Sequence, residues 1–70
     1  MREYIQNEVH AFRTKKGVTQ EQLAEKMAVS RQTIIAIEKG NYTPSVLLAL
    51  KLADFFDQSV EKVFHISYEK

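Results

Sequence analysis

Apolar residues recur at three- and four-residue spacing along most of the chain, which predicts a succession of short amphipathic helices. The positions expected to face inward are Val9 and Phe12, then Leu23, Ala24 and Met27, then Ile34 and Ile37, and finally Leu48, Ala49, Leu52, Phe55 and Phe56. Polar and charged residues occupy most of the positions between them. Each helix therefore has one face for a core and another for solvent.

Residues that favour helix ends divide this pattern into five helices. The expected helices cover about residues 8–16, 20–27, 31–39, 46–56 and 60–64, with Asn7, Thr19, Ser30, Ser45 and Ser59 as their N-caps. Thr19 and Gln22 have the spacing of a capping box, and a glycine follows the first and the third helix. Only Ala28-Val29-Ser30 separates the second helix from the third, so residues 19–39 are expected to form an abrupt helix-turn-helix.

The pattern changes near the C-terminus, where apolar and polar residues alternate from Phe64 to Tyr68. This period of two predicts a strand, and Tyr4 and Ile5 are candidates for its partner. A two-stranded ribbon is only marginally stable by itself. The expected fold is therefore an all-α domain of five helices, to which the two tails add a small antiparallel β-ribbon.

Composition limits the class of protein. Seventy residues suit a single domain spanning 1–70, and the absence of cysteine excludes disulfides and thiolate metal sites. The longest apolar run, Val46 to Leu50, is far too short to span a bilayer, and the first ten residues lack the apolar core of a signal peptide. These features predict a cytoplasmic protein with no membrane association.

The net charge of +1 does not by itself indicate a nucleic-acid partner. The distribution is more informative, because residues 9–43 carry six Lys and Arg against three Glu, whereas residues 44–70 carry three Lys against four acidic residues. A basic first half beside a mildly acidic second half suggests that one face meets an anion and another meets protein.

The segment from Val18 to Asn41 resembles the Cro/phage-repressor type of helix-turn-helix, the XRE family. The matching features are Thr19-Gln20, Leu23-Ala24, Val29-Ser30, Ile34, Ile37-Glu38-Lys39-Gly40 and, downstream, Pro44-Ser45 followed by LALKLADFF. The resemblance extends over roughly residues 8–64. It implies a repressor-like domain that binds the major groove of double-stranded DNA as a homodimer on a two-fold-symmetric operator.

The first turn of the third helix has side chains suited to reading base edges. Arg31 can bond guanine through two donors, Gln32 can pair with adenine, and Thr33 adds a hydroxyl. Ile35 and Ala36 are the next outward positions, and the resemblance makes all five candidate base contacts. Ile35 remains open between packing on a thymine methyl and a contact with the core or a second subunit.

The resemblance also assigns supporting roles. Gln20, at the start of the second helix, and Lys39, Asn41 and Tyr42, just past the third, match family positions that contact DNA phosphates. Arg13 and Glu38 match a partly buried salt bridge that holds the recognition helix. Two positions depart from the family pattern, since Ala28 and Asp57 stand where glycine is common.

Several apolar residues exceed what a five-helix core needs, and they predict a dimer interface within about residues 45–70. The residues assigned to it are Leu50, Phe55, Phe64, Ile66 and Tyr68. A different interpretation is a protein-interaction module, such as an antitoxin or adaptor, which would use the apolar residues around Ile35 and Leu47. The sequence leaves both open.

An enzyme is not expected. His10 and His65 are the only histidines, and there is no cysteine nucleophile, no glycine-rich phosphate loop and no spacing typical of metal ligands. No catalytic residue, cofactor, metal or small-molecule ligand is therefore predicted.

Overall fold

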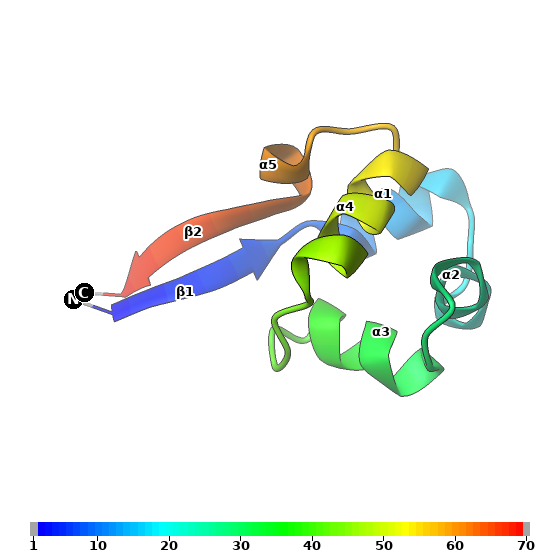
Figure 1. Ribbon diagram of the computed structural model, residues 1–70, viewed down its shortest axis with the longest axis horizontal. Helices are drawn as coiled ribbons and strands as arrows, with labels where there is room; N and C mark the ends of the chain where they lie inside the picture. The colour runs from blue at the N-terminus through cyan, green and yellow to red at the C-terminus, as the bar shows by residue number, and fades with distance from the viewer. Residues whose placement is uncertain (1, 70) are drawn as a thin grey trace.

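The computed structural model describes residues 2–69, which form a bundle of short helices and a two-stranded ribbon that projects from it (Figure 1). The elements in order are β1 (Arg2–Asn7), α1 (Val9–Lys16), α2 (Gln20–Met27), α3 (Arg31–Glu38), α4 (Val46–Phe55), α5 (Val60–Val63) and β2 (Phe64–Glu69). The helices lie within one or two residues of the ranges expected from the sequence.

All five helices contribute to one hydrophobic core. Its fully buried side chains are Val9, Leu23, Ile34, Ile37, Leu52 and Val63. Phe12 of α1 stacks on Phe56, just past α4, with ring centroids 5.7 Å apart. The inward faces predicted for α1, α2 and α3 are confirmed, and burial of these side chains supplies most of the driving force for folding.

Local hydrogen bonds fix where α2 and α3 begin. The Thr19 hydroxyl accepts the backbone N–H of Gln22, and the Gln22 side chain accepts the N–H of Thr19, which confirms the capping box. Ser30 caps α3 by accepting the N–H of Thr33. Between the two helices Ala28 adopts a left-handed conformation with φ 59° and ψ 41°, so the turn forms without glycine.

One predicted N-cap lies at a different residue, and another occupies its predicted position without a capping hydrogen bond. Glu8, not Asn7, occupies the N-cap position of α1. Asn7 belongs to β1, and its Oδ1 nevertheless accepts the N–H of Val9 at 3.1 Å. Ser59 is the N-cap residue of α5, as predicted, but its side chain makes no capping hydrogen bond.

The five-helix fold is confirmed, and the two tails form the small antiparallel ribbon that was expected beside it. Each strand has six residues, and the register places Asn7 opposite Phe64 and Ile5 opposite Ile66. The pairing continues into the helical body through a hydrogen bond from Glu8 N–H to the carbonyl of Val63 at 2.9 Å. The ribbon is thus joined to the core at its base, which compensates for its marginal stability in isolation.

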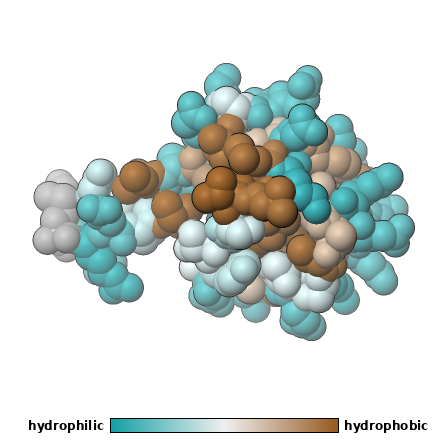
Figure 2. All heavy atoms as spheres, in the orientation of Figure 1, coloured by the Kyte–Doolittle hydropathy of each residue, from teal (hydrophilic) through white to brown (hydrophobic). Residues whose placement is uncertain are grey.

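Apolar side chains remain exposed on one side of the molecule. Figure 2 shows them on the ribbon and over α4 in the same view. Val46 is 77% exposed, Leu47 69% and Leu50 52% on α4, while Ile66 and Tyr68 on β2 are 55% and 56% exposed. None of the helices within residues 2–69 has the length and apolar character needed to cross a membrane.

Two of the residues expected at a dimer interface are less available than the sequence suggested. Phe55 and Phe64 are only partly exposed, because both pack against the core of their own chain. Phe55 also contacts Phe56 edge-on, and the Lys16 ammonium lies 4.9 Å from the centre of its ring. Both were counted as spare apolar residues, whereas part of each side chain contributes to the core of its own chain.

Candidate nucleic-acid interface

The N-terminal turn of α3 is exposed and firmly supported from behind. Arg31 and Gln32 are exposed on this turn, while Ile34 and Ile37 on the opposite face are completely buried. The Ser30 cap adds a second restraint at the point where the helix begins. Two long polar side chains are therefore presented to solvent from a helix whose position is fixed by the core.

The other three candidate base contacts are less accessible. Thr33, Ile35 and Ala36 are each partly buried. The Thr33 hydroxyl lies 3.0 Å from the hydroxyl of Ser30, so part of its hydrogen-bonding capacity is already used. Arg31 and Gln32 are consequently the most available polar groups on the first turn.

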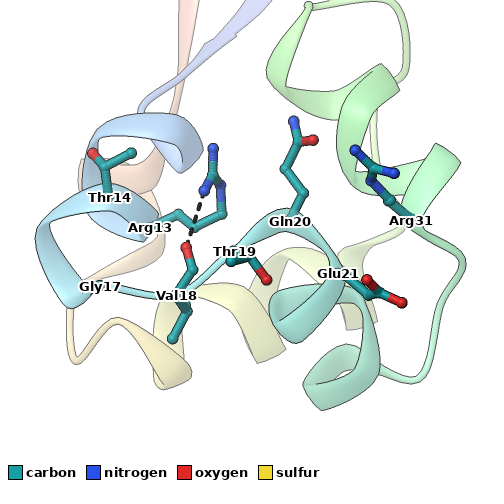
Figure 3. Close-up of a pocket in the computed structure, with 8 residues that line it drawn as sticks. All are labelled: Arg13, Thr14, Gly17, Val18, Thr19, Gln20, Glu21 and Arg31. Carbon is teal, nitrogen blue, oxygen red and sulfur yellow. Dashed lines mark hydrogen bonds between the residues drawn. The ribbon is translucent and has the colours of Figure 1, made fainter.

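A hollow of about 530 Å³ lies beside this turn, between the end of α1 and the start of α2. Its lining residues are Arg13, Thr14, Gly17, Val18, Thr19, Gln20, Glu21 and Arg31. In Figure 3 the side chains of Arg13, Gln20 and Arg31 point to the same side, each from a different helix. The hollow is lined by the start of α2 and by two cations, of which Arg13 is paired with Glu38, while the Glu21 carboxylate also lies in its wall. Arg31 and the helix N-terminus favour an anion here, and Glu21 opposes it.

Gln20 has a structural role that the sequence did not reveal. Its Nε2 donates a hydrogen bond of 3.1 Å to Oε1 of Glu38, which joins the start of α2 to the end of α3. The resemblance assigned Gln20 to a phosphate only. The two residues are 18 positions apart, and no local pattern in the sequence links them.

Glu38 is the acceptor at the centre of a polar cluster. Its side chain is 6% exposed, and Arg13 approaches it with Nε at 2.6 Å from Oε2 and with Nη2 at 3.2 Å from Oε1. Burial by itself raises the pKa of a carboxyl group, but hydrogen bonds from Arg13, Gln20 and His10, together with the Arg13 charge, lower the pKa of Glu38 below its ordinary value of 4.5. The carboxylate is thus ionised and fully paired at neutral pH.

The same arginine also fixes the chain between α1 and α2. Its Nη1 donates to the carbonyl of Val18 at 3.0 Å, as the dashed line in Figure 3 indicates. Arg13 therefore connects α1 and the loop before α2 to the last turn of α3. A guanidinium group suits this position, because it presents several donors in a rigid plane.

His10 joins this cluster from the surface and was not singled out by the sequence as part of it. Its Nδ1 lies 3.3 Å from Oε1 of Glu38 and 3.1 Å from Nη2 of Arg13. Nδ1 can donate to the carboxylate when it carries a proton, or accept from the guanidinium when it does not. The first arrangement adds a contact between α1 and α3, whereas the second stays within α1.

The segment after α3 presents the remaining candidate phosphate contacts. Lys39, Asn41 and Tyr42 are all exposed there. Gly40 has φ 79°, and the N–H of Asn41 bonds back to the carbonyl of Ala36 at 2.9 Å, which fixes the turn that orients this segment. These residues lie at the opposite end of α3 from Arg31 and Gln32.

A further hydrogen bond holds the end of α2. Nζ of Lys51, on α4, donates to the carbonyl of Met27 at 2.8 Å. A lysine in this place satisfies a carbonyl that a helix leaves unpaired at its C-terminus. The turn between α2 and α3 is thereby supported from the far side of the core.

The chain is similar to known proteins over most of its length. A family model described as helix-turn-helix matches residues 9–63. An HTH-type transcriptional regulator of Methanocaldococcus jannaschii is 52% identical over 60 residues, which cover 86% of this chain and 91% of that protein. The HTH-type transcriptional regulator YgzD of Bacillus subtilis is 46% identical over 65 residues, covering 93% and 98% of the two chains.

Among solved structures, the chain resembles the restriction-modification controller protein C.AhdI of Aeromonas hydrophila. The TM-score is 0.70 at 31% sequence identity, and the match covers 77% of this chain and 78% of the controller. The similarity therefore extends through most of both molecules and is not confined to one motif.

Proposed function

Because the chain belongs to the helix-turn-helix family of DNA-binding transcriptional regulators, we propose that it is a repressor that occupies a two-fold-symmetric operator as a homodimer. The observation that carries the proposal is the exposed first turn of α3, which is backed by Ile34 and Ile37 and adjoins the hollow lined by Arg31 and the start of α2. Proteins of this family bind DNA and are not enzymes. A regulator that acts on the genome in this way would reside in the cytoplasm.

Arg31 and Gln32 are the proposed principal readers of the major groove. An arginine can donate two hydrogen bonds to guanine and a glutamine can pair with adenine, and each good pair contributes about 1–3 kcal/mol of discrimination between bases. Thr33, Ile35 and Ala36 are proposed to complete the contact surface. Partial burial of Ile35 favours a packing role, although a thymine methyl can still contact its exposed part.

Gln20, Lys39, Asn41 and Tyr42 are proposed to bind phosphates on either side of the groove. Gln20 lies at the hollow, and its hydrogen bond to Glu38 orients the side chain, leaving the second amide hydrogen and the oxygen for other partners. The other three lie beyond the far end of α3. Contacts of this kind fix the register of the protein on DNA and carry little sequence information.

Two copies would associate through the C-terminal part of the chain, about residues 45–70. One helix reads too few base pairs for useful specificity, and a two-fold dimer reads half-sites about 34–36 Å apart. The proposed interface consists of Leu50, Ile66 and Tyr68, together with the exposed parts of Phe55 and Phe64. Its support is the exposed apolar surface that α4 and the ribbon present on one side of the molecule (Figure 2).

Residues 19–39 would then serve as the DNA-reading unit of a single domain. Repression would follow because the bound dimer blocks access of the polymerase to the DNA.

In vitro selection from random duplex DNA tests the proposal. We expect the wild-type protein to enrich a two-fold-symmetric site at near-physiological salt, where non-specific phosphate binding is suppressed. Arg31→Ala should then relax the preference at one position of each half-site and reduce affinity for the selected site about tenfold or more. Lys62→Ala removes the same charge from α5 and should leave the selected sequence unchanged. Folded protein that enriches no site contradicts the proposal.

The exposed face of α4 supports a second candidate function, an antitoxin or adaptor that binds another protein. Val46 and Leu47 are among the most exposed apolar side chains, and a DNA reader does not require them. The two functions can coexist, because an antitoxin can also repress its own operon. Failure to enrich DNA, together with copurification of a second protein that Leu47→Glu abolishes, would favour this candidate.

A further inference from the structure

One side chain joins the ribbon to both the first and the third helix. Asn7 is the last residue of β1, and its Oδ1 accepts the N–H of Val9 at the start of α1. Its Nδ2 donates a hydrogen bond of 2.9 Å to the carbonyl of Ile37, in the last turn of α3. The two functional groups of one amide are therefore used on two different helices.

The partner of Asn7 on α3 is well fixed. Ile37 is completely buried, and its carbonyl also accepts the N–H of Gly40 at 3.0 Å. Within residues 2–69, no other hydrogen bond given by the structure connects a ribbon side chain to α3. Asn7 thus provides the direct polar link between the ribbon and the helix that carries Arg31 and Gln32.

The base of the ribbon is restrained at the same point. Asn7 pairs with Phe64 across the ribbon, and the adjacent Glu8 N–H bonds to the Val63 carbonyl. A ribbon of six residues per strand spans about 20 Å, so a rotation of about 10° at its base moves its far end by about 3.5 Å. This displacement is close to the rise of one base pair, about 3.4 Å.

We propose that Asn7 is a positioning residue that sets the angle between the ribbon and α3, and thereby the spacing between half-sites that the dimer accepts. The inference rests on the proposed function, in which the ribbon contributes to the dimer interface and α3 reads DNA. Asn7 itself contacts neither the bases nor, in this scheme, the second subunit. Its effect on DNA recognition is transmitted through the carbonyl of Ile37.

Two substitutions separate this role from helix capping. Asn7→Asp keeps an oxygen for the N–H of Val9 and replaces the donor facing Ile37 with a second acceptor, which the carbonyl repels. Asn7→Ser keeps a capping oxygen and removes the Nδ2 amide group that donates to Ile37, without introducing a charge; its one hydroxyl is carried on a shorter side chain. Ser67→Ala is the matched control, because it removes a ribbon hydrogen bond, from Ser67 Oγ to Gln6 Oε1, that does not involve α3.

The experiment measures binding to operators whose two half-sites are moved one base pair closer together or farther apart. We expect the wild-type protein and Ser67→Ala to discriminate strongly against both altered sites. In Asn7→Asp and Asn7→Ser, loss of one hydrogen bond should reduce the discrimination between spacings about three- to tenfold. The affinity of these variants for an isolated half-site should change less than about twofold. Thermal unfolding of each variant, measured alongside, establishes that folded proteins are compared.

The outcomes distinguish the inference from the function on which it rests. If the wild-type protein has no preferred spacing, the dimeric mode of binding is wrong and the role of Asn7 is excluded with it. If the wild type has a preferred spacing and both Asn7 variants keep it, only the inference is overturned. If the Asn7 variants lose affinity equally for operators of every spacing and for the isolated half-site, Asn7 is a purely structural residue and the inference is also overturned.

Discussion

At the scale of single residues, polar side chains add a second restraint on α3 to the one that its buried apolar face provides. Arg13, Gln20 and His10 all converge on the carboxylate of Glu38. Each belongs to α1 or α2, whereas Glu38 ends α3. An apolar contact can slide by a fraction of an ångström, but a set of short hydrogen bonds on one carboxylate permits little movement. We interpret the cluster as the element that keeps the reading helix in a fixed orientation.

Removing the carboxylate should therefore affect stability more than DNA recognition. Glu38→Ala leaves the Arg13 guanidinium buried without its partner, which costs about 3–5 kcal/mol in comparable pairs. We expect a large fall in the melting temperature and a smaller fall in DNA affinity per folded molecule. Thermal unfolding and titration of the folded fraction measure the two effects. A larger loss of affinity than of stability would contradict the structural role.

The charge of Glu38 also makes a prediction about pH. The pKa of Glu38 is lowered in the folded protein, so its contribution to stability is present above the ordinary value of 4.5 and is lost as the pH falls through the folded pKa. Glu38→Gln lacks this titration. The difference in free energy of unfolding between wild type and Glu38→Gln should be greatest above about pH 5 and should shrink on acidification. Denaturant unfolding at several pH values tests this, and a constant difference would exclude it.

At the scale of elements, what could be predicted from the sequence depends on the distance between interacting residues. The Thr19–Gln22 capping box was predictable because its two residues lie within one helical turn. The buried faces of α2 and α3 were predictable because apolar residues recur along each helix at three- and four-residue spacing. The Arg13–Glu38 pair was expected only through the family resemblance.

The links from Gln20 to Glu38, from Asn7 to Ile37 and from Lys51 to Met27 were not predicted. They join residues 18, 30 and 24 positions apart, respectively. Such contacts exist only once the helices have packed, and neither periodicity nor capping preference encodes them.

The turn between α2 and α3 offers a test of local conformational strain. Ala28 has φ 59°, a left-handed conformation that costs a residue with a Cβ about 1–2 kcal/mol. Ala28→Gly should raise the free energy of unfolding by about 0.5–1 kcal/mol, because relief of strain exceeds the added flexibility of the unfolded chain. The expected rise in melting temperature is a few degrees, on the order of 4–8 °C per kcal/mol for a domain of this size.

Gly17 provides the reciprocal control. It has φ 77°, and a Cβ added there meets no atom within 4 Å. Gly17→Ala should therefore destabilise the protein by strain alone, by about the amount that Ala28→Gly stabilises it. If both substitutions change stability in the same direction, left-handed strain is not the controlling term.

At the scale of the whole molecule, exposed apolar surface is concentrated away from the candidate DNA-reading turn. The first turn of α3 and the hollow beside it are polar, whereas α4 and the ribbon carry the large exposed apolar side chains. A protein this small gains stability from an additional buried surface, because its own core covers a limited fraction of the chain. Association through α4 and the ribbon would supply that surface and leave the reading helix free.

A single charge should disrupt this association. Leu50→Glu places a carboxylate in the proposed interface, and we expect the mass in solution to fall from twice 8.1 kDa to 8.1 kDa. Tyr42→Glu is the matched control, because Tyr42 is similarly exposed, at 47% against 52% for Leu50, but lies outside the interface. Gel filtration with light scattering at several protein concentrations measures the mass. A wild-type monomer, or a dimer unaffected by Leu50→Glu, would rule out this interface.

The ribbon also has a consequence for the order of folding. Its paired residues are separated by 57 positions at Asn7 and Phe64 and by 67 at Arg2 and Glu69, whereas neighbouring helices follow one another closely along the chain. Closing so long a segment is entropically costly until the helices have brought its ends together. We therefore expect the ribbon to pair last, from its base outward, and its contacts to slow unfolding more than they speed folding. In the proposed dimer, assembly of two copies would then follow the completion of folding, and a newly synthesised chain would acquire its helices before it acquired its partner.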